Sequence, residues 1–285
     1  MQALIAILAA LLLAAGMAIA GGSGGLQIGS LSLFAICGLL AFAIQWLAFI
    51  PAFVLQTERY YDLTGSLTYI LLALVALMLA TPEDVPRMLI AVLVMAWACR
   101  LGSFLFLRIR RAGEDSRFRR IKPHFLRFLM TWTLQGLWVY VTFAAGLAAI
   151  LSSQPATISA STLLGLAAWL LGFTIEVVAD GQKHRFRAKP ENRDRFISHG
   201  LWRYSRHPNY FGEILLWCGI ATIAYPMLSG WQYLTLVSPL FVYLLLTRVS
   251  GVTLLEASGR QRWGDDPAYQ AYCERTPTLF LNPLL

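Results

Sequence analysis

Eight apolar stretches, each about 18 residues or longer, constrain this chain of 285 residues more than any other feature. A helix of about 20 apolar residues is long enough to cross the hydrocarbon core of a bilayer. The composition agrees, since 58% of the residues are hydrophobic and only 13% are charged. It excludes a disordered chain, a nucleic-acid-binding module and an ordinary soluble enzyme. The expected spans are residues 3–20, 31–55, 63–80, 88–107, 128–151, 158–179, 210–228 and 231–249.

We therefore predict an all-α fold, a polytopic membrane helical bundle of about eight transmembrane helices. The bundle is expected to form a single domain over residues 1–285. The first stretch lacks the basic residues that begin a signal peptide, so we retain it as a span. Seven spans remain if it is removed or lies outside the core. Pro51 is expected to kink the second span or to end it near the following loop.

Basic residues are distributed unequally between the loops that join these spans. Residues 100–127 contain nine Lys and Arg residues, and residues 183–206 contain eight. With eight spans, these segments and both termini share one side, which then carries every basic residue except Arg87. Cytoplasmic loops of membrane proteins are enriched in Lys and Arg, so we expect both termini in the cytoplasm. This arrangement also explains the net charge of +8 without a nucleic-acid partner.

Ionisable residues lie inside several of the apolar stretches, where they are costly and mark candidate functional sites. Residues three or four apart share one face of a helix, so this spacing gathers polar side chains into stripes. We find one such stripe on each of the sixth, seventh and fourth spans. In that order, the stripes are Glu176-Asp180-His184-Arg187, Asn209-Glu213-Trp217 and Arg100-Phe104-Arg108-Arg111. The first stripe shares one face if the sixth helix continues past the membrane.

We expect the three stripes to meet at the cytosolic edge of the bundle, around a cavity with a basic mouth and an apolar interior. Arginine binds phosphate groups in a bidentate manner, so such a mouth suits a phosphorylated cofactor. An apolar interior suits a lipid-soluble substrate. The alternative is that these residues snorkel and pair at helix ends, which only fixes the topology. The four cysteines show no metal-ligand spacing, so we expect no disulfide framework and no metal site.

The segment 200–213, with the sequence GLWRYSRHPNYFGE, resembles the steroid 5-alpha reductase family. The resemblance is strongest to the bacterial branch of unassigned function and covers about residues 56–282. The segments 113–118 (GEDSRF) and 262–272 (RWGDDPAYQAY) fit the same branch. The pattern Arg-His-Pro-x-Tyr-x-Gly-Glu also occurs in sterol C14 reductases, which bind NADPH. It occurs as well in isoprenylcysteine carboxyl methyltransferases, which bind S-adenosylmethionine.

This resemblance implies a membrane-embedded, NADPH-dependent reductase of the carbon–carbon double bond of an enone lipid, such as a 3-oxo-4-ene steroid. It also implies a steroid- or isoprenoid-like substrate, contact with membrane lipid and a place in the bacterial inner membrane. Five residues fall where the family places its cofactor contacts: Asp180, Arg187, Arg195, Asn209 and Glu213. Tyr204, Arg206 and His207 are expected to wall the same pocket. His207 and Pro208 alternatively form only the turn that starts the seventh helix. The expected cofactor-binding residues are Asp180, His184, Arg187, Arg195, Tyr204, Arg206, His207, Asn209 and Glu213.

The catalytic half of the family's site contains a Gln-Glu pair and a tyrosine near the ketone of the substrate. The reaction needs a proton donor there, because negative charge develops on the carbonyl oxygen when hydride arrives. Here Thr57 separates the two candidates, and residues 88–107 contain no tyrosine. The Glu58-Arg59 pair is alternatively an ion pair in a loop. The candidate catalytic residues are Gln56, Glu58, Tyr60, Tyr61 and Asp62.

Two other functions compete with the reductase. A membrane methyltransferase would bind S-adenosylmethionine, a sulfonium without phosphate groups. The eight cations of residues 183–206 favour NADPH instead, because NADPH carries several phosphate charges. A non-catalytic lipid-binding or scaffold protein is the third hypothesis, and the altered sequence around Thr57 is its main support. The sequence leaves the substrate and the oligomeric state undefined.

Overall fold

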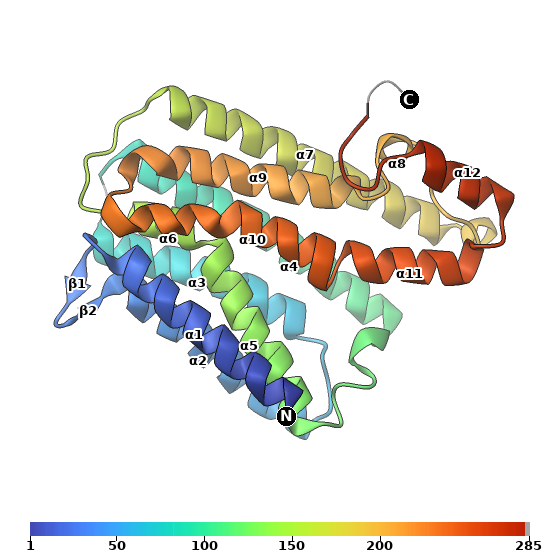
Figure 1. The fold of residues 1–285 in the computed structure, drawn as a ribbon, viewed down its shortest axis with the longest axis horizontal. Helices are drawn as coiled ribbons and strands as arrows, with labels where there is room; N and C mark the ends of the chain where they lie inside the picture. Colours follow the sequence, from blue (N-terminus) through green and yellow to red (C-terminus); the bar gives the residue numbers. More distant parts are fainter. Residues whose placement is uncertain (82, 283–285) are drawn as a thin grey trace. The chain divides into compact units, whose positions relative to one another are not determined.

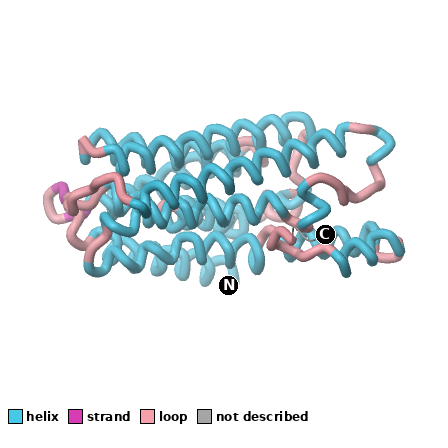
Figure 2. The backbone as a smooth tube through the Cα atoms, turned by 90° about the horizontal axis from the view of Figure 1, so that it is seen from above, coloured by secondary structure: helices cyan, strands magenta, loops and turns pink. Residues whose placement is uncertain are grey.

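The computed structural model describes residues 1–81 and 83–282, and its described part is mainly helical (Figures 1 and 2). Contacts divide the chain into two compact units. The first unit comprises Met1–Thr162 and Ile223–Ser238, and the second comprises Leu163–Thr222 and the chain from Pro239 onward. The expectation of a single domain stays a prediction. The shorter elements are β1 (Gln27–Ile28), β2 (Leu31–Ser32), η1 (Ser116–Phe118), η2 (Pro190–Asn192), α8 (Leu201–Tyr204), η3 (Tyr225–Met227) and α12 (Pro267–Arg275).

Among the described residues, seven helices are long and apolar enough to cross a membrane, and there are eight if a bent pair counts as one span. These helices make the chain a multi-pass integral membrane protein, and the predicted all-α bundle is confirmed. The second span continues through Pro51 and ends soon after it, as expected. The long helices are α1 (Gln2–Gly22), α2 (Leu33–Val54), α3 (Tyr61–Ala80), α4 (Val85–Ala112), α7 (Ala160–Ala188) and α9 (Pro208–Ala224); the bent pair is α5 (Phe125–Thr142) with α6 (Ala144–Ile150); the last span runs through η4 (Gly230–Val237), α10 (Ser238–Leu244), the π-helical turn η5 (Leu245–Val249) and α11 (Val252–Trp263).

The bend between α5 and α6 defines the centre of the first unit. The two helices differ in direction by 54°, and all seven residues of α6 are buried among α1, α3, α4, α5 and η4. Arg87 at the start of α4 lies against the end of α6, where its Nε donates to the carbonyl oxygen of Ala149 over 3.0 Å. Its Nη2 also donates to the carbonyl of Ser152 over 2.9 Å, and the guanidinium pairs with Asp84. Arg87, which the sequence places outside the predicted cytoplasmic side, is thus a buried cap for the C-terminal end of α6.

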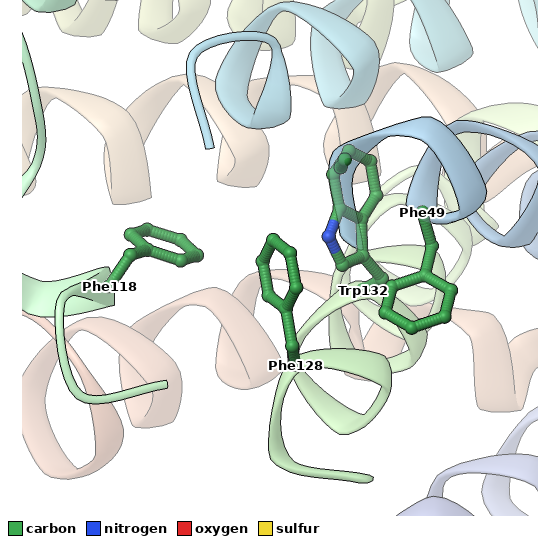
Figure 3. Close-up of a cluster of buried hydrophobic side chains, with 5 residues drawn as sticks. Phe49, Phe118, Phe128 and Trp132 are labelled. Atoms are coloured by element: carbon green, nitrogen blue, oxygen red, sulfur yellow. The ribbon is translucent and has the colours of Figure 1, made fainter. Parts of the chain in front are cut away.

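An aromatic cluster ties together the end of the first unit that carries the loop between α4 and α5 (Figure 3). Phe49 of α2, Phe118 of η1, and Phe128 and Trp132 of α5 are all buried in it. Phe49 and Phe128 meet edge to face, with ring centroids 5.7 Å apart, which is a favourable aromatic geometry. Because Phe118 belongs to the basic loop between α4 and α5, the cluster ties that loop to the helices beneath it.

Candidate functional site

Two helices of the second unit, α7 and α9, run side by side and approach closely at glycines (Figure 1). A Cβ atom on Gly212 would lie 2.5 Å from the carbonyl oxygen of Gly172, and the reverse substitution would meet the carbonyl of Gly212 at 2.5 Å. Gly219 makes the same contact with Gly165 two turns further along. Small residues allow helix backbones to pack this tightly in membranes. The contact therefore fixes the register of the two helices that carry most of the expected cofactor-binding residues.

The side chains beside this contact are acidic and buried. Glu176 is 2% exposed, and Asp180 and Glu213 are each 8% exposed. Nδ2 of Asn209 donates to Oδ1 of Asp180 over 3.2 Å, which joins the stripe predicted on α7 to the stripe predicted on α9. Helix α7 extends beyond the predicted span, so its stripe continues to the exposed His184. The stripe on α4 lies in the first unit, and its convergence with these two stays a prediction.

The connector between α8 and α9 is held by a carboxylate from α11. Nη1 of Arg206 lies 2.7 Å from Oε2 of Glu256, and Nε2 of His207 lies 2.9 Å from Oε1 of the same side chain. Nη2 of Arg206 donates to the hydroxyl of Thr278 over 2.5 Å. Arg206 is thus bound within the protein at both terminal nitrogens. Sequence reasoning missed Glu256 as a site residue.

His207 is buried, 4% exposed, and stacks on Tyr210 with ring centroids 5.6 Å apart and an angle of 7° between the rings. Burial lowers the pKa of His207, and the positive charges of Lys183 and Arg206 act in the same direction. The hydrogen bond and charge of Glu256 oppose this effect without reversing it. The imidazole is therefore neutral at physiological pH. His207 directly precedes α9, which begins at Pro208, so the structure combines the turn with a buried polar network.

The C-terminal segment lies along the same connector as a strap. Oγ of Ser205 donates to the carbonyl of Leu279 over 2.8 Å, and the backbone nitrogen of Asn282 donates to the carbonyl of Tyr204 over 3.0 Å. Tyr204 itself is half-buried, with the guanidinium of Arg203 5.8 Å above its ring. The strap holds the backbone of residues 204–206 in place. The path of this part of the tail could not be read from its sequence.

Exposed cations lie on the chain that leads from α7 to α8. Arg187 and Arg195 are both exposed, whereas Nζ of Lys183 lies 4.4 Å from the ring centroid of Trp202 in a cation–π contact. The second unit therefore combines exposed arginines with buried acids and an amide, Asn209. This donor and acceptor set fits a nucleotide, because arginines bind phosphate oxygens while carboxylates and amides bind sugar hydroxyls and amide groups.

In the first unit, Glu58 lies at an open cleft of about 680 Å³. Glu58 is 4% exposed, and both of its carboxylate oxygens accept from the basic loop between α4 and α5. Oε2 lies 2.6 Å from Nζ of Lys122, and Oε1 accepts from the backbone nitrogen of Asp115 over 2.7 Å. The ion pair of Glu58 is therefore with Lys122 rather than with its neighbour Arg59. Tyr60 also lines the cleft and is 58% exposed.

The other candidate catalytic residues differ in how they are held. Gln56 lines the cleft but has a left-handed backbone, φ 49°, and its Nε2 donates to the carbonyl of Phe53 over 2.7 Å. Residues 55–60 are not helical, so helical spacing does not relate Gln56 to Glu58. The hydroxyl of Tyr61 donates to the carbonyl of Thr131 over 3.0 Å, and its ring packs in the aromatic cluster. Oδ2 of Asp62 lies 4.0 Å from Nη2 of Arg108, at the limit of an ion pair.

The electrostatics of the basic loop favour an ionised carboxylate next to Glu58. Burial raises the pKa of Asp115, but its hydrogen bonds to Arg117 and the charges of Arg117 and Arg108 outweigh burial and lower it. The five candidate catalytic residues all belong to the first unit, and the nine candidate cofactor residues all belong to the second.

Comparison with known proteins gives matches to a family model and to curated proteins. The model described as protein of unknown function (DUF1295) matches residues 48–276. Three proteins named 3-oxo-5-alpha-steroid 4-dehydrogenase 1 are similar over shorter segments. That of Bos taurus is 34% identical over 71 residues, 25% of this chain and 27% of that protein. That of Rattus norvegicus is 36% identical over 87 residues (30% and 31%), and that of Mus musculus is 34% identical over 79 residues (28% and 29%). The chain therefore spans less than a third of the length of these relatives. No solved structure is significantly similar to it.

Proposed function

The chain belongs to the DUF1295 family, which fits the predicted bacterial branch of the steroid 5-alpha reductase family, and we propose that it is an NADPH-dependent membrane reductase. In this proposal it reduces the carbon–carbon double bond of an enone lipid. The partial likeness to 3-oxo-5-alpha-steroid 4-dehydrogenases supports the reaction class. The substrate is a hydrophobic molecule of steroid or isoprenoid type, taken from the membrane. The protein lies in a bacterial inner membrane with both termini in the cytoplasm.

The observation that carries this proposal is the α7–α9 contact with its buried polar side chains. Glu176, Asp180 and Glu213 are buried at a helix pair that closely packed glycines hold at one register. A membrane protein retains such costly groups mainly where they bind something. The exposed Arg187 and Arg195 supply positive charge for phosphate groups. The residues of the second unit therefore fit a phosphorylated nucleotide.

NADPH supplies a hydride to the β-carbon of the enone, and the chain contributes binding, orientation and a proton. Asn209 and Asp180, joined at 3.2 Å, orient the sugar or nicotinamide end. Glu213 accepts hydrogen bonds from the same end. Arg187 and Arg195 bind the phosphates, including the 2′-phosphate that distinguishes NADPH from NADH.

The proton comes from the cleft of the first unit. Glu58 and Lys122 lie in contact at 2.6 Å, and in this proposal the pair provides the proton that the substrate oxygen takes as negative charge develops there. The exposed phenol of Tyr60 adds a second hydrogen-bond donor in the same cleft. The hydroxyl of Tyr61 is bound to a backbone carbonyl, so Tyr61 serves the packing of the cleft instead.

Calorimetric titration of the purified protein in detergent tests the cofactor. We expect NADPH to bind more tightly than NADH by about tenfold or more, because one charge-assisted contact contributes about 1.5–3 kcal/mol. Asn209→Ala should weaken NADPH binding, whereas Arg127→Ala, a basic-residue change in the first unit, should not. Binding of S-adenosylmethionine without binding of NADPH would transfer the assignment to the methyltransferase class. Loss of NADPH fluorescence on addition of a 3-oxo-4-ene steroid then tests the reaction.

A further inference from the structure

Two buried polar atoms on consecutive residues have no hydrogen-bond partner among the described residues. They are Nε of Arg206 and Nδ1 of His207, and the other side-chain nitrogens of these two residues are bound to Glu256 and Thr278. Buried polar atoms are normally paired, because an unpaired one loses its water without compensation. An arginine Nε is a donor only, and a neutral imidazole has one donor and one acceptor nitrogen. The connector therefore presents Nε of Arg206 as a donor without a partner in the described part of the chain. Beside it, the tautomer of His207 decides whether Nδ1 is a donor or an acceptor.

Glu256 decides that tautomer. Its carboxylate accepts from Nη1 of Arg206 at 2.7 Å, and it lies 2.9 Å from Nε2 of His207. A carboxylate that pairs with an arginine is an acceptor only, so Nε2 of His207 must carry the proton. Burial keeps the ring neutral, which leaves a lone pair on Nδ1. The face of Tyr210 against the ring and the hydroxyl of Ser205 against the backbone nitrogen hold this orientation.

We propose that Glu256 is a positioning residue that keeps the proton of His207 on Nε2, so that Nδ1 accepts a hydrogen bond from a hydroxyl or amino group of the bound nucleotide. Nε of Arg206 provides the adjacent donor for an acceptor of the same ligand. This inference rests on the proposed function, because it takes the ligand to be a nucleotide. In this inference Arg206 orients the ligand and Glu256 sets the tautomer of His207, a role that neither the motif nor the composition indicates.

The variant Glu256→Gln gives the sharpest test, because Arg206 fixes how the new amide must lie. Arg206 offers only donors, so the amide oxygen of Gln must face Arg206 and the amide nitrogen must face His207. Nε2 of His207 then has to accept, and its proton moves to Nδ1. The substitution keeps the size of the side chain but reverses the tautomer. Glu274→Gln, an exposed change on α12, is the matched control.

Nitrogen-15 NMR of histidine-labelled protein reads the tautomer directly, since the chain has only four histidines. We expect the Nε2–H form of His207 in the wild type and in Glu274→Gln, and the Nδ1–H form in Glu256→Gln. The signals of His124, His184 and His199 report whether the variant is folded. If Glu256→Gln does not fold, the tautomer of His207 in the wild type still tests the positioning role. A wild-type Nδ1–H form, or an unchanged tautomer in a folded Glu256→Gln variant, would overturn the positioning role.

Titration with NADPH tests the ligand half of the inference. The amide nitrogen of Gln is three bonds from Cβ, as Nε2 of His is, so His207→Gln keeps the contact to Glu256 but loses the acceptor. The amide oxygen of Asn is two bonds from Cβ, as Nδ1 is, so His207→Asn keeps an acceptor there. We expect His207→Gln to bind NADPH about tenfold more weakly and His207→Asn to lose less.

In the wild type, the Nδ1 signal should shift on addition of NADPH. If NADPH binds and neither the signal nor the affinity of His207→Gln changes, the inference is wrong and the proposed function stands. If NADPH does not bind but S-adenosylmethionine does and shifts Nδ1, the proposed function is wrong. The acceptor role of His207 is then supported for a different nucleotide.

Discussion

Replacing Gly212 by alanine should separate α7 from α9 at the candidate cofactor site. The new Cβ atom would lie 2.5 Å from the carbonyl oxygen of Gly172 and 2.7 Å from the backbone nitrogen of Glu176. Both neighbours are backbone atoms, so neither can turn aside as a flexible side chain would. To reach the ordinary contact distance of 3.4 Å from that oxygen, the helices must move apart by about 0.9 Å.

The net cost follows from two opposing effects. Overpacking a tight contact costs about 1–3 kcal/mol, and this contact lies at the upper end because it meets backbone. Alanine is a better helix former than glycine by about 1 kcal/mol, which offsets part of that cost. We therefore expect a loss of about 2 kcal/mol in the free energy of unfolding and a decrease in Tm of about 4–8 °C. NADPH affinity should also decrease, because Asp180 of α7 and Asn209 of α9 would move apart with their helices.

Thermal unfolding in detergent, followed by tryptophan fluorescence, measures the change in Tm. Gly16→Ala is the matched control, since it is the same substitution within a helix and its Cβ atom would meet nothing within 4 Å. The control should unfold at or slightly above the wild-type Tm. A Gly212→Ala variant with the Tm and NADPH affinity of the control would refute the close α7–α9 contact and the site built on it.

Three further outcomes are expected. Glu58→Gln should slow reduction by about 10²-fold or more, with unchanged NADPH affinity in calorimetry; normal turnover would show that the proton comes from elsewhere. Because burial lowers the pKa of His207, the unfolded chain binds a proton below about pH 6.5 that the folded chain does not. Stability should therefore decrease as pH falls from that value, and a plot of Tm against pH should be flatter for His207→Gln. Reporter fusions at the C-terminus and in the loop 152–157 should give opposite signals, and a C-terminus that reports as external would contradict the predicted topology.

Local sequence patterns predicted the spans, because the hydropathy of about 20 consecutive residues is enough to define a membrane helix. They also predicted that α7 carries one continuous polar stripe, and the structure adds the bond between Asp180 and Asn209. Local patterns did not predict the bend after α5, because an apolar run has the same composition whether its helix is straight or broken. Nothing in the run of residues 128–151 marks residue 143 as the end of one helix.

The partners of the site residues were beyond local reasoning for a different reason. Glu58 binds Lys122, and Arg206 binds Glu256, over separations of 64 and 50 residues along the chain. Many basic residues compete for each carboxylate in such a sequence, and only the fold selects one. Sequence reasoning offered Glu58 as a candidate catalytic residue, which stays a prediction, and its alternative, an ion pair with Arg59, named the wrong cation for this structure.

The enclosure of α6 has a consequence for how this gene tolerates mutation. Its seven residues, mainly alanine and glycine, lie in a stretch that hydropathy alone would assign to lipid contact, yet Ala144, Ala145, Ala148 and Ala149 are fully buried. Lipid would accept a leucine at any of these positions, but close-packed protein does not. In a library of all single substitutions, alanine-to-leucine changes should be depleted within α6 and retained at lipid-facing positions of α1. The broken helix would therefore be visible in variant frequencies alone.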